Sequence, residues 1–201
     1  MSRYMTTLPP EFHAGYYEHE SDPWHFETSP YEKAKYAATL AALPKARYRS
    51  VFEVGCSIGI QTRLLAQRSD AVRAFDVVPS ALETARRNCA GQPHVRFELA
   101  AVPEAWPEGK FDLIMLSEVL FFFDRADLAR IVARVKDTLL PGGDVVVVNW
   151  LGETNFPLTG DEASDGFIAG ASGFLRRGHG ARTDKYRLDV LTRGMNGKKV
   201  A

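Results

Sequence analysis

The stretch Val51-Phe52-Glu53-Val54-Gly55-Cys56-Ser57-Ile58-Gly59-Ile60 decides the fold of this 201-residue chain. Its first four residues form a short, mostly apolar run that is typical of a buried strand. Gly55 and Gly59 then allow a tight turn, and the residues that follow place Ile60, Leu64 and Leu65 on one face of a helix. A strand, a turn and a helix in this order predict the first βαβ unit of a parallel sheet.

The same alternation continues along the chain. Helices are expected to start near Ser29, Ser80 and Asp124, the first two with capping boxes, and Pro141-Gly142-Gly143 is expected to end the last of them. The predicted fold is therefore α/β, a mostly parallel twisted sheet with helices on both faces. The further predicted strands are 71–75, 95–99, 111–116 and 145–148, with an antiparallel C-terminal hairpin formed by a strand around 174–177 and one at 186–192.

Composition narrows the class of protein. The 25 basic and 25 acidic side chains cancel, so the basic excess of a general nucleic-acid binder is missing. No apolar run approaches the roughly 20 residues that span a bilayer, and the N-terminus lacks an apolar leader, which predicts a cytoplasmic protein. Two cysteines, Cys56 and Cys89, are too few for a disulfide framework or a structural zinc site. No metal, membrane or nucleic-acid partner is expected.

The carboxyl ends of the parallel strands are where such folds bind their ligands. The residues expected there are 55–59, Asp76, Ser117, Glu118, Asn149 and Trp150. The 55–59 loop does not fit a dinucleotide fingerprint, because Ser57 and Ile60 stand where the second and third glycines belong. A phosphate-binding P-loop is also excluded, since no Gly-Lys-Ser/Thr follows. The sequence thus argues against a nicotinamide oxidoreductase.

The glycine loop instead resembles the first motif of class I S-adenosylmethionine-dependent methyltransferases, an acidic residue followed by a spaced pair of glycines. The resemblance covers about residues 45–195 and includes Asp76, the run Phe111-Asp112-Leu113-Ile114 and the run Leu140-Pro141-Gly142-Gly143. It implies a single Rossmann-like methyltransferase domain over residues 29–201. The cofactor implied is S-adenosylmethionine, with S-adenosylhomocysteine as its product.

The resemblance also implies roles for individual residues. Asp76 is expected to accept the two ribose hydroxyls, or else to serve as a cap for the helix after it; Glu53 is expected to hold the cofactor's ammonium, or else to brace the loop. Many family members carry an Asp after the third strand for the adenine, but Ala101 stands there, so backbone groups are expected to replace it. The expected cofactor-binding residues are Glu53, Gly55, Cys56, Gly59, Asp76, Val77, Ala101, Val102 and Ser117.

A closer resemblance is to the NodS family of nodulation-factor N-methyltransferases. It is carried by the segments Ser21-Asp22-Pro23-Trp24-His25-Phe26, Pro30-Tyr31-Glu32 and Ser117-Glu118-Val119-Leu120-Phe121-Phe122. That family methylates the free amine of the de-N-acetylated terminal sugar of a chito-oligosaccharide. The resemblance implies N-methylation of an amine on a sugar-like small molecule. A small-molecule O-methyltransferase of secondary metabolism and a non-catalytic cofactor-binding module stay open as alternatives.

Residues 1–28, rich in Tyr, His and Pro, are expected to form a flexible lid over the site. Trp24 and Tyr31 are suited to stack on an acceptor, and Asn149 and Trp150 are expected to line the same pocket. Glu118 is the expected catalytic residue, although it can instead pair locally. An amine attacks only when neutral, and a carboxylate favours the ammonium form, so Glu118 assists only if it also takes the proton. His13, His19 and His25 are alternative bases.

Overall fold

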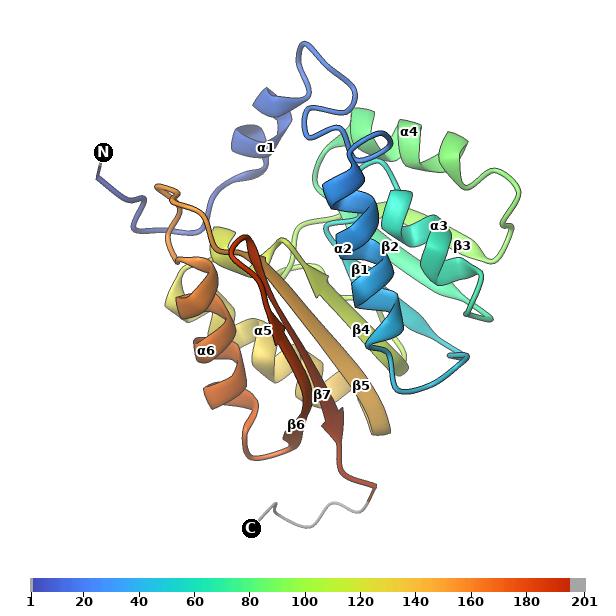
Figure 1. Ribbon diagram of the computed structural model, residues 1–201, viewed down its shortest axis with the longest axis vertical. Helices are drawn as coiled ribbons and strands as arrows, with labels where there is room; N and C mark the ends of the chain where they lie inside the picture. Colours follow the sequence, from blue (N-terminus) through green and yellow to red (C-terminus); the bar gives the residue numbers. More distant parts are fainter. Residues whose placement is uncertain (1, 196–201) are drawn as a thin grey trace.

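The computed structural model describes residues 2–195 as a seven-stranded sheet with helices on both faces (Figure 1). The strand order is β3-β2-β1-β4-β5-β7-β6. The first five strands run parallel to one another, whereas β7 is antiparallel to both β5 and β6. The strands are β1 (Val51–Val54), β2 (Val72–Asp76), β3 (Val95–Leu99), β4 (Phe111–Ser117), β5 (Leu139–Trp150), β6 (Leu175–Arg182) and β7 (Tyr186–Arg193). This is the predicted α/β fold with its antiparallel C-terminal pair.

The helices form the two outer layers. In Figure 1, α2 and α3 lie on one side of the sheet, α5 and α6 lie on the other, and α1 stands apart from both layers. The helices are α1 (Pro10–Tyr16), α2 (Pro30–Ala41), α3 (Ile60–Ala66), α4 (Pro79–Asn88), α5 (Arg125–Thr138) and α6 (Gly160–Ala171), with a 3₁₀ turn η1 (Leu120–Phe122). No helix within residues 2–195 is long and apolar enough to cross a membrane.

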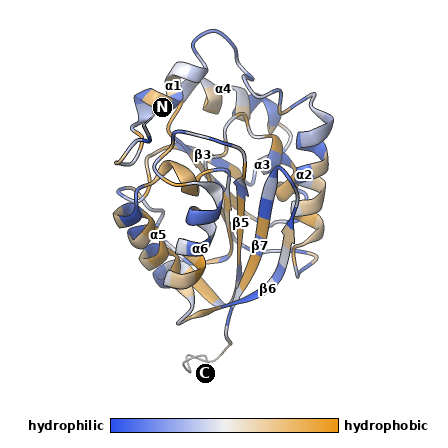
Figure 2. Ribbon diagram, turned by 60° about the vertical axis from the view of Figure 1, so that its left-hand side comes forward, coloured by the Kyte–Doolittle hydropathy of each residue, from blue (hydrophilic) through white to orange (hydrophobic). Residues whose placement is uncertain are grey.

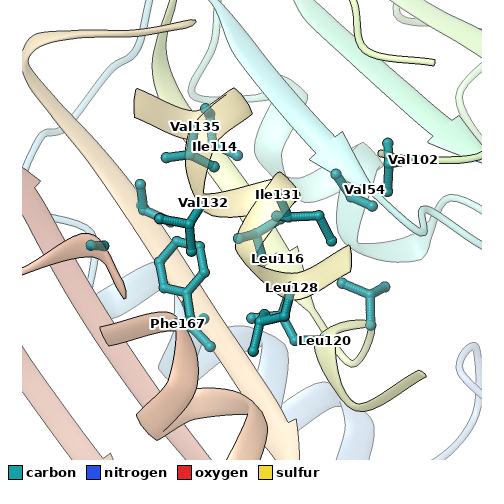
Figure 3. Close-up of a cluster of buried hydrophobic side chains, with 14 of the residues drawn as sticks. Val54, Val102, Ile114, Leu116, Leu120, Leu128, Ile131, Val132, Val135 and Phe167 are labelled. Carbon is teal, nitrogen blue, oxygen red and sulfur yellow. The ribbon is translucent and has the colours of Figure 1, made fainter. Parts of the chain in front are cut away.

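Apolar side chains hold both layers on the sheet. Because successive strand residues point to opposite faces, Ile114 and Leu116 of β4 meet Leu128, Ile131 and Val135 of α5 on one face (Figure 3). On the other face Leu113 and Met115 join a second cluster that includes residues of β1, β2, β5 and β7. Figure 2 shows the apolar colour gathered along the central strands. Burial on both faces explains why these strands read as continuous apolar runs.

Two local expectations are corrected. Helix α5 ends at Thr138, because Leu139 already pairs with Phe111 in the sheet, so Pro141-Gly142-Gly143 lies within β5 and does not end the helix. Helix α4 starts at Pro79 with Val78 as its N-cap, and the expected Ser80 capping box is absent. The link from β3 to β4 contains no helix; Trp106 packs against Phe52 there.

The N-terminal segment is more regular than its composition suggests. Residues 10–16 form α1, which starts with a proline and buries none of its own residues. Leu8 donates its backbone N–H to the Phe122 carbonyl at 2.9 Å, and Tyr4 donates to the Asn155 carbonyl at 2.8 Å. The segment therefore runs over the carboxyl ends of the strands and is attached on the β5 side of the sheet.

Candidate functional site

A cavity of about 750 Å³ lies at the carboxyl ends of β1, β2, β4 and β5. Its size falls in the range of small-molecule sites. It spans the junction of β1 and β4, where the chain order of the sheet reverses and doubly wound folds bind ligands. Loop residues after these strands line one part of the cavity, and the N-terminal segment with the start of α2 lines the rest.

The loop after β1 contains three residues with positive φ angles, a conformation that favours glycine. Gly55 and Gly59 have φ angles of +73° and +78°, and Ser57 between them has φ +49°. A Cβ on Gly59 would lie 2.9 Å from the Ala85 Cβ, and one on Gly55 would lie 2.3 Å from a Val119 methyl carbon. Gly55 lines the cavity, whereas Gly59 lies behind it and allows α3 to pack on α4.

Asp76 ends β2 and fixes this loop from the next strand. One of its carboxylate oxygens accepts the Ser57 N–H at 2.7 Å, and the other accepts the Val78 N–H at 2.9 Å. Burial raises the pKa of the Asp76 carboxyl, and the backbone N–H groups oppose that rise. Each oxygen has a second lone pair, so the carboxylate both caps the start of α4 and can still accept hydroxyl groups from a ligand.

Glu53 is a buried carboxylate that lacks a full set of partners. Its residue is 2% exposed, it lines the cavity, and its Oε2 has no hydrogen-bond partner among residues 2–195. Burial raises the pKa of Glu53 to about 8, and the nearby Asp76 adds to this rise. A buried acid in this state is costly for the folded protein, and a cationic ligand group would relieve it.

These residues fit the cofactor that the sequence implies. The orphaned Glu53 oxygen matches an ammonium group, and the Asp76 carboxylate matches a pair of hydroxyls. The remaining expected cofactor residues that line the cavity are Gly55, Cys56, Val77, Ala101, Val102 and Ser117. Burial also raises the pKa of the Cys56 thiol, which makes it a small packing residue and not a nucleophile.

Glu118 follows β4 and is held by two partners. Its Oε1 accepts from the Lys35 ammonium at 2.8 Å, and its Oε2 accepts from the Trp150 N–H at 2.8 Å. Its φ of +58° is rare for a residue other than glycine. Burial raises the pKa of the Glu118 carboxyl, while Lys35 lowers it. The expected acceptor carboxylate is in the cavity, but both of its oxygens already accept hydrogen bonds.

Lys35 and Glu32 are two functional candidates that the sequence interpretation missed. They lie one turn apart on α2 and are 3% and 7% exposed. The Lys35 Nζ donates to Glu32 Oε1 at 3.1 Å and also lies 3.0 Å from Glu32 Oε2. Glu32 was expected only to complete a capping box, yet its carboxylate turns to Lys35 while the Ser29 side chain caps the helix. The spacing of an i,i+3 pair was the available signal.

Aromatic side chains form much of the remaining wall. Tyr31 makes an edge contact with Trp150, with ring centroids 6.1 Å apart, and both line the cavity. Trp24 lines it from the N-terminal segment, stacked on Phe26. The Tyr17 hydroxyl lies 2.5 Å from the Ser57 hydroxyl, so this segment also contacts the glycine loop.

Of the three histidines weighed as bases, only His13 lines the cavity. Its ring makes an edge contact with Phe122, and burial lowers the pKa of His13 to about 4. His19 and His25 are more exposed, and His25 lies near Glu20. Within residues 2–195, no three His, Cys, Asp or Glu side chains gather as a metal site.

Asn149 is not among the residues that line the cavity. It is 0% exposed, and its Nδ2 donates to the Ser164 hydroxyl of α6 at 2.9 Å. The reason is the alternation of side chains along β5: Trp150 turns to the cavity, so Asn149 turns to the opposite layer. Asn149 therefore belongs to the contact between α6 and the sheet.

Comparisons with known proteins agree with this geometry. The family model for nodulation protein S (NodS) matches residues 18–148. Nodulation protein S of Rhizobium tropici is 32% identical over 127 residues, which cover 62% of this chain and 53% of that protein. The chain spans about half the length of the curated relatives it matches.

Two solved structures extend the comparison. A proposed methyltransferase from Pseudomonas syringae is 36% identical with a TM-score of 0.71, over 81% of this chain and 99% of that one. The N-methyltransferase NodS of Bradyrhizobium japonicum WM9, solved with S-adenosylhomocysteine, has a TM-score of 0.73 at 19% identity. That match covers 86% of this chain and 92% of that one. The second likeness supports the fold.

Proposed function

The chain belongs to the nodulation protein S family, and from this premise we propose that it is an S-adenosylmethionine-dependent methyltransferase that methylates an amine on a sugar-like small molecule. The observation that carries the proposal is the pairing of two features in one cavity. A glycine loop with two buried carboxylates, Glu53 and Asp76, lies on one side, and an acidic, aromatic wall around Glu118 lies on the other.

The residues proposed for the cofactor act by binding and orientation. Asp76 would accept ribose hydroxyls while its bonds to Ser57 and Val78 keep the loop in place. Glu53 would take the ammonium group, and backbone near Ala101 and Val102 would contact the adenine. When bound, the cofactor supplies an electrophilic methyl group on sulfur. Correct alignment of this group with a nucleophile is worth about 7–11 kcal/mol, so no single side chain needs to carry the rate.

The charges of the cavity favour an amine acceptor. Among residues 2–195, Lys35 is the only lysine that lines the cavity and no arginine does, and Lys35 is already paired with two carboxylates. A polyanionic acceptor, such as a tricarboxylate, would meet carboxylates without compensating cations in this cavity, whereas an ammonium group would gain a partner. Glu118, Tyr31 and Trp150 are therefore proposed to bind the acceptor, with Trp24 as a further stacking surface.

The alternative of a hydroxyl acceptor finds less support. A hydroxyl has a high pKa and needs a strong general base. His13 is the one histidine on the cavity, and its pKa near 4 makes it a weak base. An amine with a free lone pair needs no such base at the moment of attack.

Residues 1–28 are proposed to act as a lid. Arg3 bonds to the Phe156 and Pro157 carbonyls and to Glu162 on one side of the cavity, and Tyr17 bonds to Ser57 on the other. A segment anchored at both ends in this way would exclude water from the reacting groups when it closes.

The test is methyl transfer from radiolabelled S-adenosylmethionine to three acceptors: a chito-oligosaccharide with a free terminal amine, its fully N-acetylated counterpart and the tricarboxylate citrate. Label is expected in the free amine compound alone. Transfer to citrate would contradict the amine proposal, and no binding of S-adenosylhomocysteine would contradict the methyltransferase class.

A further inference from the structure

The side chains of Glu32, Lys35 and Glu118 form a buried array on the acceptor side of the cavity. The Lys35 ammonium sits between the two carboxylates, 2.8 Å from Glu118 Oε1 and 3.0 Å from Glu32 Oε2. The exposed fractions of the three side chains are 3% for Lys35, 9% for Glu32 and 23% for Glu118. All three residues line the cavity, so a bound ligand would meet the array as a unit.

The side chains of the array do not use all of its hydrogen-bonding capacity. Glu118 uses both oxygens, one on Lys35 and one on the Trp150 N–H. Glu32 Oε1 accepts a hydrogen bond from Lys35, whereas the buried Glu32 Oε2 lies 3.0 Å from the same ammonium as an ion pair and accepts no hydrogen bond in the described part of the chain. The buried Tyr31 hydroxyl next to it in sequence has none either. Buried polar atoms that make no hydrogen bond destabilise the folded state, so both atoms are free to accept one from a ligand.

The charge of the array is also uncompensated. Two carboxylates and one ammonium leave one net negative charge. Among the described residues that line the cavity, the other carboxyl groups are Glu53, Asp76, Glu104 and Asp127, and Lys35 is the sole lysine or arginine. Lys185 lies over the Tyr31 ring, 5.0 Å from its centroid, but does not line the cavity. A buried negative charge in an acidic cavity attracts one cation.

We propose that this array is the amine site: Glu32 Oε2 binds the ammonium form of the acceptor, and Lys35 is the positioning residue that holds both carboxylates. The inference rests on the proposed function and names the residues that select its substrate. Because the array carries one net charge, it favours a monocationic amine and disfavours neutral amides and polyanions. The sequence predicted Glu118 as the catalytic residue and did not single out Glu32. Glu32 is the group proposed here to contact the substrate.

The same contact supplies a destination for the proton. The ammonium N–H bond breaks, an O–H bond forms on Glu32, and the electron pair stays on nitrogen, which leaves a neutral amine beside a neutral carboxylic acid. When S-adenosylmethionine is bound, it would supply the methyl group for this neutral nitrogen, and its sulfur would keep the electron pair of the carbon–sulfur bond. Loss of the Glu32 proton to solvent restores the array, so one proton is released for each methyl group transferred.

The test measures binding of glucosamine and N-acetylglucosamine to the protein loaded with S-adenosylhomocysteine, by calorimetry or NMR titration. Glu32→Gln and Glu118→Gln each bring the array to zero charge, and both are expected to weaken glucosamine binding at least tenfold. Glu83→Gln makes the same chemical change at an exposed site and should change nothing.

The outcomes separate this inference from the proposed function. Affinity for S-adenosylhomocysteine reports that each variant is folded. The array is overturned if wild type does not prefer glucosamine, or if both glutamine variants bind it as wild type does. Charge-dependent binding without methyl transfer would contradict the proposed function alone. Transfer to amines with unchanged KM in Glu32→Gln would contradict the array alone.

Discussion

The Lys35 ammonium lies 2.8 Å from Glu118 Oε1, and this contact joins α2 to the turn after β4. The two residues are 83 positions apart in the chain. The ion pair brings the first helix of the domain to the carboxyl edge of the central strands, where Glu118 also holds the Trp150 N–H of β5. The acceptor side of the cavity is therefore built around the ion pair of Lys35 and Glu118.

Substitution of Lys35 should lower the free energy of unfolding. In Lys35→Met two buried carboxylates face each other without a cation, and loss of one partner from a buried pair typically costs about 3–5 kcal/mol. Denaturant unfolding should show a loss of that order, with little loss in Lys33→Met on the exposed face of α2. Equal stabilities of the two variants would contradict a buried ion pair at Lys35.

Asp76→Asn should weaken the cofactor site. The carboxylate accepts two backbone N–H groups and is proposed to accept ribose hydroxyls. An amide keeps one acceptor oxygen and loses the charge, and charge-assisted hydrogen bonds are worth about 1.5–3 kcal/mol each. Calorimetry is expected to show a tenfold to hundredfold loss in affinity for S-adenosylhomocysteine. An unchanged affinity would mean that Asp76 caps α4 and does not bind the cofactor.

Gly59→Ala should destabilise the fold. The residue has a φ of +78°, and its new Cβ would approach the Ala85 backbone Cα to 3.0 Å, where the chain has no flexible group to move. A loss of about 1–3 kcal/mol is expected in thermal or chemical unfolding. Gly91→Ala is the matched control, because nothing lies within 4 Å of its Cβ position and its φ is not positive.

Glu53 gives stability a defined pH dependence. Burial raises the pKa of Glu53 to about 8 in the folded protein, from an ordinary value of 4.5 in the unfolded chain. Between these values the folded state holds a proton that the unfolded state has lost, so stability falls as pH rises. A single proton gives a slope of about 1.4 kcal/mol per pH unit. The free-energy advantage of Glu53→Gln over wild type should therefore grow from pH 5 to pH 8 and then level off.

The same titration predicts proton release on cofactor binding. An ammonium group beside Glu53 favours its ionised form and lowers its pKa. At pH 7 the wild-type protein should release up to about one proton when S-adenosylhomocysteine binds. Calorimetry in buffers of different ionisation enthalpy measures this number directly. A release as large in Glu53→Gln would assign the proton to another group.

Tyr17→Phe tests the proposed lid. The change removes the Tyr17 contact with the Ser57 hydroxyl and leaves the aromatic contact with Trp24. Loss of one hydrogen bond, worth about 1 kcal/mol, should speed dissociation of S-adenosylhomocysteine roughly fivefold. Stopped-flow fluorescence of the tryptophans measures the rate. Tyr4→Phe, on the far side of the segment from the glycine loop, is the comparison variant.

The fold could be predicted from local patterns because the strands are buried on both faces. The apolar run Val51–Val54 and the turn at Gly55 can be recognised from the local sequence alone. The alternation of strands and helices along the chain then predicts a parallel sheet. The expected glycine loop, Asp76 and Glu118 all meet at one edge. The predicted end of α5 was wrong because Leu139 continues the apolar spacing of the helix. In the structure Leu139 instead pairs with Phe111 and belongs to β5.

The array of Glu32, Lys35 and Glu118 could not be predicted from the sequence, for a physical reason. Glu32 and Lys35 form an i,i+3 pair of a kind that is ordinary on exposed helix surfaces. Only the position of α2 against the β4–β5 edge buries them and adds Glu118 from a distant segment. Asn149 shows the reverse: its neighbour Trp150 lines the cavity, and the register of β5 turns Asn149 to Ser164.

The most direct measurement of the central claim is the position of the transferred methyl group. The protein would be incubated with S-adenosylmethionine that carries a deuterated methyl group and a chito-oligosaccharide with one free amine, and the product fragmented by mass spectrometry. The label is expected on the amine nitrogen, with no label in the N-acetylated compound. Label on a hydroxyl oxygen, or equal labelling of both compounds, would contradict an amine-directed methyltransferase.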